Sequence, residues 1–560
     1  MSSTNRPTRR SNAFWRAFAS LFLLLGLVAP TLYAASPSVL RVNVDATERG
    51  KTIGNKVSTV NIWQFQTFPL TPKDEGANLS EFVEYVQFMQ ATGGNASRDL
   101  FVAPENRDVV DDYDFEPLLK ACRGVLDLGA KPHIKLSVPD KFSKETVVDG
   151  FGVNALPPDD YEVYYRYIQA MTSALVERFG LDEIKTWGFG VLVEFENASW
   201  FHDKAKSPEG SRDAYFKLYD YSVAALCDQL GSDIWVGAHA MACTEGLWDE
   251  RDFLDHCAKD VNAKTGESPI PIKYFAVSFY DDAPDRPHPM TLAETVERIR
   301  ERADAVGLTD LRYGVDEGRI LASRPGKNAG DLTFRIVGQT YQAAFDARIF
   351  KILIDSDIDY FSAWSYSTSS PWGGYPLIAY RVAQNVAKFK NAKLLETTEE
   401  KTLDEGVDCD AVAAFDEDAQ TFRLMAYNFK YDLEYDKSAD VSFDVDAPFW
   451  KGRRVKVVET TIDDKENFFC DWLADKERLQ IPDDAFSWSP DSGNLDVGWI
   501  NPEYKALYDK ELRARYLEKA NRPPRSVERE VVVGDDGRFS LSTTLDRHGV
   551  VFYTATLVEE

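Results

Sequence analysis

The sequence predicts an α/β fold, a (β/α)8 TIM barrel followed by a C-terminal β-sandwich. Two observations favour it: β-rich runs alternate with amphipathic helical stretches over residues 57–398, and short strands separated by turn signals dominate 399–560. A third observation argues against the runner-up, an open doubly wound sheet, because that fold favours a glycine-rich phosphate turn after its first strand and this sequence has none there. A length of 560 residues also calls for at least two domains.

The expected barrel strands are short runs rich in β-branched and aromatic residues. They span 57–63, 96–101, 132–138, 187–194, 233–239, 274–279, 311–317 and 360–365. The helices expected between them have apolar residues at helical spacing and span 79–91, 115–128, 161–179, 214–230, 291–306 and 334–355. Another helix is expected over 376–389.

In the C-terminal part the expected strands are 411–415, 421–427, 439–445, 455–460, 528–533 and 550–557, and Asp535-Asp536-Gly537 is a hairpin turn signal. The segment 36–56 contains one more alternating strand, which we expect to join the sandwich. A charged helical insertion over 503–521 has no role that the sequence assigns.

Residues 1–35 have the layout of a secretory signal peptide. Four arginines precede a short apolar run, and small residues follow it. We therefore expect an exported protein, periplasmic or extracellular, with no membrane association after cleavage. Removing the four arginines changes the formal charge from −27 to −31, which argues against nucleic acid as a partner.

The six cysteines are scattered and include no CxxC pair, and no histidine stands at metal-ligand spacing. We expect neither a metal site nor a cofactor. Cys243 and Cys257 are the cysteines closest in sequence, and the pattern leaves open whether they pair. The oligomeric state is also left open.

Two glutamates end apolar barrel strands. Glu194 closes the fourth expected strand and Glu317 closes the seventh, and catalytic groups of a TIM barrel gather at the carboxyl ends of its strands. A pair of carboxylates is what glycoside hydrolysis requires, since one group protonates the leaving oxygen while the other attacks the anomeric carbon. Glu196 and Asp316 are competing carboxylates that alternation cannot exclude at a strand end.

Several segments resemble glycoside hydrolase family 39, which contains β-xylosidases and α-L-iduronidases. WGFGVLVEFENASWF at 187–201 is similar to that family's acid/base segment, and GGNASRDLF at 93–101 to its second strand. YDFEPLLKACRGVLDLGAKPHIKLSVP at 113–139, FSAWSYS at 361–367 and GGYPL at 373–377 match further barrel segments. TTIDDKENFFCDWL and DGRFSLSTTLDRHGV resemble the family's sandwich.

The resemblance implies that Glu194 is the general acid/base and Glu317 the nucleophile, with Tyr280 and Arg98 holding Glu317 ionised. The sequence departs from the family at Val193, where an asparagine that binds the sugar 2-hydroxyl is expected, and at Ser278, where many relatives have histidine.

Other side chains near strand ends are candidates for substrate contacts. Trp364 and Trp372 would stack on a sugar ring, and Asn95, His133, Lys135 and His239 would contact sugar hydroxyls or line the site. Four candidates have a structural alternative: barrel-mouth core for Trp364, an ion pair for Lys135 and Arg98, and a satisfied buried ring for His239.

The sequence thus favours an exported retaining exo-glycosidase acting on an oligosaccharide or glycoside, with β-xylosidase-like activity as the first expectation. Two alternatives stay open. One is a non-catalytic carbohydrate-binding protein on a decayed barrel; the other is an α-L-iduronidase-like enzyme that binds uronic acids through a cationic subsite.

Overall fold

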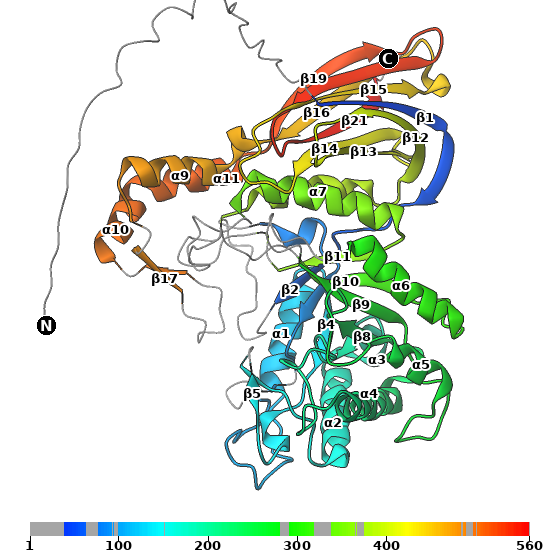
Figure 1. Ribbon diagram of the computed structural model, residues 1–560, viewed down its shortest axis with the longest axis vertical. Helices are drawn as coiled ribbons and strands as arrows, with labels where there is room; N and C mark the ends of the chain where they lie inside the picture. Colours follow the sequence, from blue (N-terminus) through cyan, green and yellow to red (C-terminus); the bar gives the residue numbers. More distant parts are fainter. Residues whose placement is uncertain are drawn as a thin grey trace, which may run out of the picture. The chain divides into compact units, whose positions relative to one another are not determined.

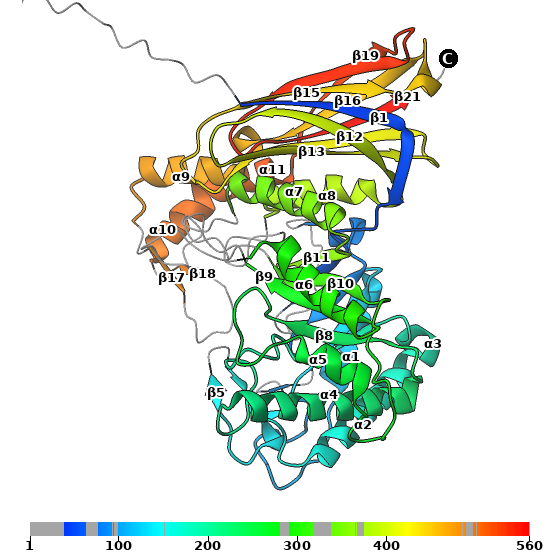
Figure 2. The same cartoon turned by 45° about the vertical axis from the view of Figure 1, so that its right-hand side comes forward.

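The computed structural model describes residues 38–558 apart from 63–76, 92, 95–98, 150–151, 281–289, 319–337, 365, 367–374, 483–484, 489–496 and 500. Eight parallel strands close into a barrel in the order β10-β11-β2-β3-β4-β7-β8-β9 (Figures 1 and 2). They are β2 (Thr59–Ile62), β3 (Tyr85–Phe88), β4 (Lys131–Leu136), β7 (Gly188–Val191), β8 (Trp235–Ala240), β9 (Tyr274–Phe279), β10 (Arg312–Gly318) and β11 (Tyr360–Ala363). The predicted fold class is confirmed.

The barrel helices bury their apolar stripes against these strands. They are α1 (Glu116–Asp127), α2 (Tyr161–Phe179), α3 (Leu181–Ile184), α4 (Pro208–Leu230), α5 (Asp252–Lys259), α6 (Leu292–Ala305), α7 (Thr340–Asp355) and α8 (Ile378–Val386). Their starts follow the capping rules: the Asp160 side chain accepts from the backbone of α2, and Thr291 with Glu294 forms a capping box on α6. A two-stranded hairpin, β5 (Val148–Asp149) and β6 (Val153–Asn154), follows β4.

The prediction for the second barrel strand is wrong. β3 lies inside the segment expected to be a helix, where only Leu79–Glu81 forms a 3-10 turn, and Phe101 makes an isolated bridge to Tyr113 instead of belonging to a barrel strand. Apolar residues at 79, 82, 83 and 86 mimic helical spacing, but β3 is a four-residue strand within a fully buried wall. Periodicity alone does not separate such a strand from a helix.

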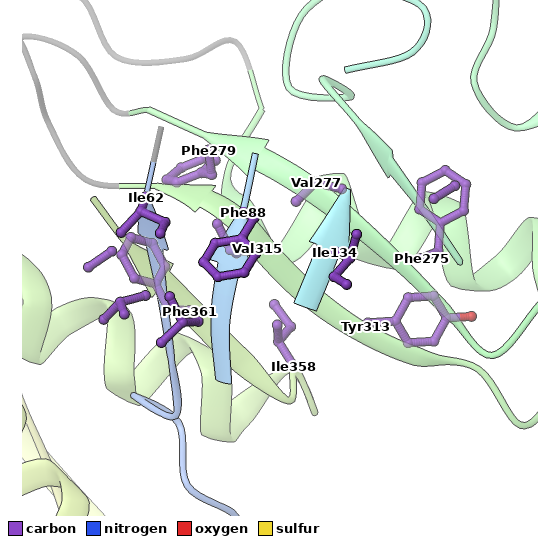
Figure 3. Close-up of a cluster of buried hydrophobic side chains, with 14 of the residues drawn as sticks. Ile62, Phe88, Ile134, Phe275, Val277, Phe279, Tyr313, Val315, Ile358 and Phe361 are labelled. Carbon is purple, nitrogen blue, oxygen red and sulfur yellow. The ribbon is translucent and has the colours of Figure 1, made fainter. Parts of the chain in front are cut away.

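The barrel strands place apolar side chains on their helix-facing side. Figure 3 shows part of this layer, including Ile62, Phe88, Ile134, Val277 and Val315, all buried. Alternation directs the residues between them into the barrel. The interior is unusually polar, and close approaches by glycine make room for it: a Cβ on Gly190 would lie 2.7 Å from Lys135 Cδ, and one on Gly314 would lie 2.2 Å from the Tyr360 ring.

A nine-stranded mixed sheet forms the second part, in the order β19-β16-β21-β14-β13-β12-β1-β15-β20. Its strands are β1 (Ser38–Thr52), β12 (Lys393–Thr402), β13 (Val407–Asp416), β14 (Thr421–Lys430), β15 (Ala439–Asp446), β16 (Arg454–Ile462), β19 (Arg525–Val532), β20 (Arg538–Leu545) and β21 (Val550–Leu557). One apolar core takes residues from strands near both ends of this order, such as Phe443 and Val457. β1 lies between β12 and β15, and the sheet begins at Lys393, before the boundary expected at 399.

Helix α7 connects the barrel to this sheet. Tyr341 and Phe345 on α7 pack their rings against Phe429 of β14, with centroids 5.1 and 6.0 Å apart. A single apolar cluster includes these residues together with the barrel's outer layer. The barrel and the sheet therefore share a core.

The predicted insertion forms α10 (Pro502–Leu507), a π-helical turn (Tyr508–Leu512) and α11 (Arg513–Asn521), which pack with α9 (Phe468–Arg478). Tyr375, which precedes α8 of the barrel, is buried in this cluster, and its hydroxyl lies 2.6 Å from that of Tyr508. A short hairpin, β17 (Phe486–Trp488) and β18 (Val497–Trp499), lies between α9 and α10 in the sequence. Among the helices described, none combines the length and apolarity needed to cross a membrane.

Candidate active site

A β-bulge in β10 places two consecutive carboxylates at different levels of the barrel. The register to β9 runs from Val315↔Val277 directly to Glu317↔Ser278, so Asp316 is the extra residue. Asp316 accepts hydrogen bonds inside the barrel, whereas Glu317 is held at the end of the strand by Tyr280, which follows β9. The bulge thus answers the question that alternation left open between these two residues.

Glu194 lies in a tight turn directly after β7. Its φ is +46° and that of Leu192 is +62°, both in the left-handed region that non-glycine residues rarely adopt. Asn197 closes the turn, because its backbone N–H donates to Glu194 O at 2.8 Å and its side chain donates to Glu194 Oε2 at 2.7 Å. The strained turn and its closing residue fix the direction of the Glu194 carboxyl.

Strand β9 and the residue that directly follows it provide one hydroxyl for each glutamate. Tyr280 donates to Glu317 Oε1 at 2.7 Å, and the Trp364 indole N–H donates to the Tyr280 oxygen, which leaves the Tyr280 hydrogen free for Glu317. Ser278, two residues earlier on the same face, lowers the pKa of Glu194. One strand therefore connects both carboxyl groups, although Glu194 and Glu317 are far apart in the sequence.

The two carboxyl groups are buried and interact. Burial raises the pKa of Glu317 well above its usual value, and the charge of Glu194 raises it further, while the Tyr280 hydrogen bond lowers it. Burial also raises the pKa of Glu194, while the Ser278 hydroxyl and the hydrogen bond from Asn197 lower it. Because each charge disfavours the other, the pair favours a state in which one carboxyl group holds a proton.

Two predicted substrate contacts belong to the barrel core instead. Lys135 is fully buried and forms an ion pair with Asp316, whose Oδ1 also accepts from Gln87 at 2.9 Å and from Tyr360 at 2.5 Å. His133 is fully buried, and its Nε2 lies 2.9 Å from the Tyr274 hydroxyl. Alternation on β4 directs both side chains into the barrel, where they contact these partners.

His239 is likewise fully buried, and its Nε2 lies 2.9 Å from Ser278 Oγ. It does not line the site for a sugar; it contacts a residue that contacts Glu194. Trp364 is only partly buried and packs beside a small apolar cluster of Met89, Val153, Val193 and Trp200. The candidates Asn95, Arg98 and Trp372, and the signal peptide, lie outside the described residues.

Glu196, the other competing carboxylate, does not join the pair. It is fully buried and accepts the backbone N–H of Ala242 at 2.8 Å, and burial followed by the nearby charge of Glu250 raises its pKa well above the usual value. Sequence reasoning missed Asn197 and Gln87 as partners of site carboxylates. No local signal marks Gln87, since its role depends on the bulge in β10.

In the described part of the chain, no group of three or more His, Cys, Asp or Glu side chains could hold a metal ion. All six cysteines are free thiols, including Cys243 and Cys257.

A closed parallel barrel with paired, interacting glutamates at the carboxyl ends of its strands has the architecture of the TIM-barrel glycosidases. The family model "Glycosyl hydrolases family 39" matches residues 83–306. The match confirms the resemblance to glycoside hydrolase family 39 that the sequence motifs predicted.

A β-xylosidase from Caldicellulosiruptor saccharolyticus is 24% identical over 349 residues, which cover 59% of this chain and 66% of the relative, just under two thirds. A monomeric β-xylosidase structure from Caulobacter crescentus CB15 superposes with a TM-score of 0.64 at 16% identity, covering 93% of this chain and 100% of that one. A bacterial orthologue of human α-L-iduronidase gives 0.62 at 15% identity, covering 93% and 84%. At these identities, the two structures show a shared fold.

Proposed function

We propose that this protein is an exported retaining exo-glycosidase with β-xylosidase-like specificity. The observation that carries the proposal is the arrangement of Glu194 and Glu317, two buried and interacting carboxyl groups at the same end of one barrel, each with a hydroxyl partner from β9. The β-xylosidase relative supports the choice of sugar. The arginine-rich apolar N-terminus supports export.

The proposed reaction has two displacements. In the first, ionised Glu317 attacks the anomeric carbon, the glycosidic C–O bond breaks, and protonated Glu194 gives its proton to the leaving oxygen. In the second, ionised Glu194 takes a proton from water, the water oxygen attacks the anomeric carbon, and Glu317 leaves. A pair that holds one proton suits this exchange, since the proton is on Glu194 when Glu317 attacks.

Removing Glu317 tests the proposal and the assignment of roles together. Glu317→Gly should abolish turnover of an aryl β-D-xyloside, and added azide should restore part of it while giving the glycosyl azide of inverted configuration. Glu194→Ala should keep activity on substrates with good leaving groups, and azide should then give the retained configuration. The NMR spectrum of each product reads its anomeric configuration. Full activity of Glu317→Gly would exclude this function.

The iduronidase-like alternative needs a cation that faces the substrate. Among the described residues beside the two glutamates, the charge of Lys135 is already committed to Asp316. A panel of aryl xylosides and iduronides decides between the two activities. The non-catalytic alternative predicts no hydrolysis of any glycoside in the panel, and the convergence of the two glutamates argues against it.

A further inference from the structure

His239 is a buried group that the two-displacement reaction does not use. It is 0% exposed on β8, and burial lowers its pKa to about 3, so the ring is neutral. The positive charge of Lys135 opposes its protonation further. A neutral histidine carries one N–H, and its position determines what the ring does for its neighbours.

The surroundings of the ring place that hydrogen. Nε2 lies 2.9 Å from Ser278 Oγ, and Nδ1 has no hydrogen-bond partner among the described residues. With the hydrogen on Nδ1, a buried donor would be left without an acceptor, which is rarer and costlier than a buried lone pair without a donor. The hydrogen therefore belongs on Nε2, and His239 donates to Ser278 Oγ.

This direction controls the serine hydroxyl. Because Ser278 Oγ accepts from His239, the single hydroxyl hydrogen of Ser278 is available to its other neighbour, Glu194. The result is a chain of donors, His239 Nε2–H to Ser278 Oγ–H to the Glu194 carboxyl. It parallels the chain from Trp364 through Tyr280 to Glu317.

We propose that His239, acting through Ser278, is a positioning residue that aims the carboxyl of Glu194 at the leaving oxygen. The inference rests on the proposed function, in which Glu194 is the general acid. Asn197 fixes one carboxyl oxygen of Glu194 from its own turn, and the Ser278 hydroxyl acts on the same carboxyl group from β9, where it lowers the Glu194 pKa. Two contacts from different elements determine the orientation of a planar carboxyl group, whereas a single contact leaves the group free to rotate.

The leaving-group dependence of kcat/KM separates a positioning role from a structural one. Phenyl β-D-xyloside needs protonation of its leaving oxygen, whereas 2,4-dinitrophenyl β-D-xyloside does not. Ser278→Ala and His239→Leu should lower kcat/KM for the phenyl substrate by ~10–100-fold, within the range by which a general acid contributes. The dinitrophenyl substrate should change by less than about 3-fold, since it bypasses the acid. His239→Gln, which keeps an N–H near Nε2, should recover most of the phenyl activity.

His548 offers a matched control in the nine-stranded sheet. Its ring is also buried, its Nε2 lies 3.0 Å from the carbonyl oxygen of Asp432, and Nδ1 lacks a partner among the described residues. His548→Leu should affect both substrates equally. Equal losses on both substrates in Ser278→Ala, or no recovery in His239→Gln, would overturn the positioning role.

A second readout does not depend on activity. A carbonyl oxygen only accepts, so the His548 hydrogen must be on Nε2, and its 15N shifts provide an internal reference. In protein labelled with 15N-histidine, with signals assigned by the His239→Gln and His548→Gln variants, His239 should show the same tautomer as His548. An Nδ1–H signal for His239 would refute the donor chain. A wild-type enzyme that hydrolyses neither xyloside would instead refute the proposed function, leaving the tautomer result to stand alone.

Discussion

At the scale of single residues, the backbone of Glu194 is strained, because its φ of +46° lies in the left-handed region. A left-handed conformation costs a residue with a Cβ about 1–2 kcal/mol, and glycine avoids this cost. Glu194→Gly should therefore have a higher free energy of unfolding than Glu194→Ala by ~1 kcal/mol, although both lose the carboxyl group. Urea denaturation of the two variants measures the difference. If Glu194→Ala were as stable as Glu194→Gly, the turn at residue 194 would not be strained by a Cβ atom.

The Tyr280 hydroxyl controls the ionisation of Glu317. Its hydrogen bond lowers the pKa of Glu317 against burial and the neighbouring charges of Glu194 and Asp316, with Lys135 also lowering it. Tyr280→Phe removes that bond, so the pKa of Glu317 rises. In the proposed reaction Glu317 attacks only when ionised. The acidic limb of the kcat/KM profile should therefore move to higher pH by ~1–2 units, because a hydrogen bond to a charged group contributes about 1.5–3 kcal/mol.

The control for this experiment is Tyr435→Phe, which removes a buried hydroxyl bonded to Asn428 in the nine-stranded sheet. The control should leave the acidic limb where it is in the wild type. If the acidic limb of the kcat/KM profile of Tyr280→Phe matched that of the wild type, the Tyr280 hydroxyl would not control the pKa of Glu317.

At the scale of secondary-structure elements, the bulge in β10 supports a buried ion pair. Burial disfavours both charges, but the charge of Lys135 holds the pKa of Asp316 well below its usual value. Lys135→Met leaves Asp316 without its counter-charge and should destabilise the protein by ~3–5 kcal/mol. The double variant Lys135→Met/Asp316→Asn, which removes both charges, should be more stable than Lys135→Met.

Urea denaturation of the single and double variants checks this. Lys456→Met is the matched control, because Lys456 pairs with Glu528 at 2.8 Å where both side chains are about half exposed. It should change the free energy of unfolding by less than about 1 kcal/mol. A double variant as unstable as Lys135→Met would show that lost packing, and not the unpaired charge, causes the instability.

The elements also show where sequence reasoning succeeds. Seven of the expected barrel strands overlap observed ones, because their β-rich runs alternate with helices whose caps and apolar stripes are local features. Glu194 and Glu317 could be predicted as candidates because each ends such a run. Other features depend on long-range structure: Lys135 pairs with Asp316 only because of the bulge in β10, and β3 resembles a helix until its neighbours bury it.

At the scale of the whole molecule, the residues from Ser38 to Glu560 form one compact unit. Phe429 is buried where β14 meets α7, so Phe429→Ala should destabilise the protein by ~3–5 kcal/mol. Because the barrel and the sheet share this core, calorimetry should still show a single transition at a lower temperature. The control is Phe449→Ala, at a residue that is 44% exposed in the turn Pro448–Trp450. This variant should lower the transition temperature much less. Two separated transitions in the wild type would contradict the shared core.

The position of β1 has a consequence for how the chain is completed. Val39 pairs with Thr402 on one side, and Ser38 pairs with Ala439 on the other, so the first strand made by the ribosome has no partner until the whole barrel has been synthesised. Contacts this distant in sequence slow folding. While it waits, the nascent strand presents unpaired backbone along both edges. β1 therefore remains prone to aggregation until β12 and β15 have been translated and pair with it.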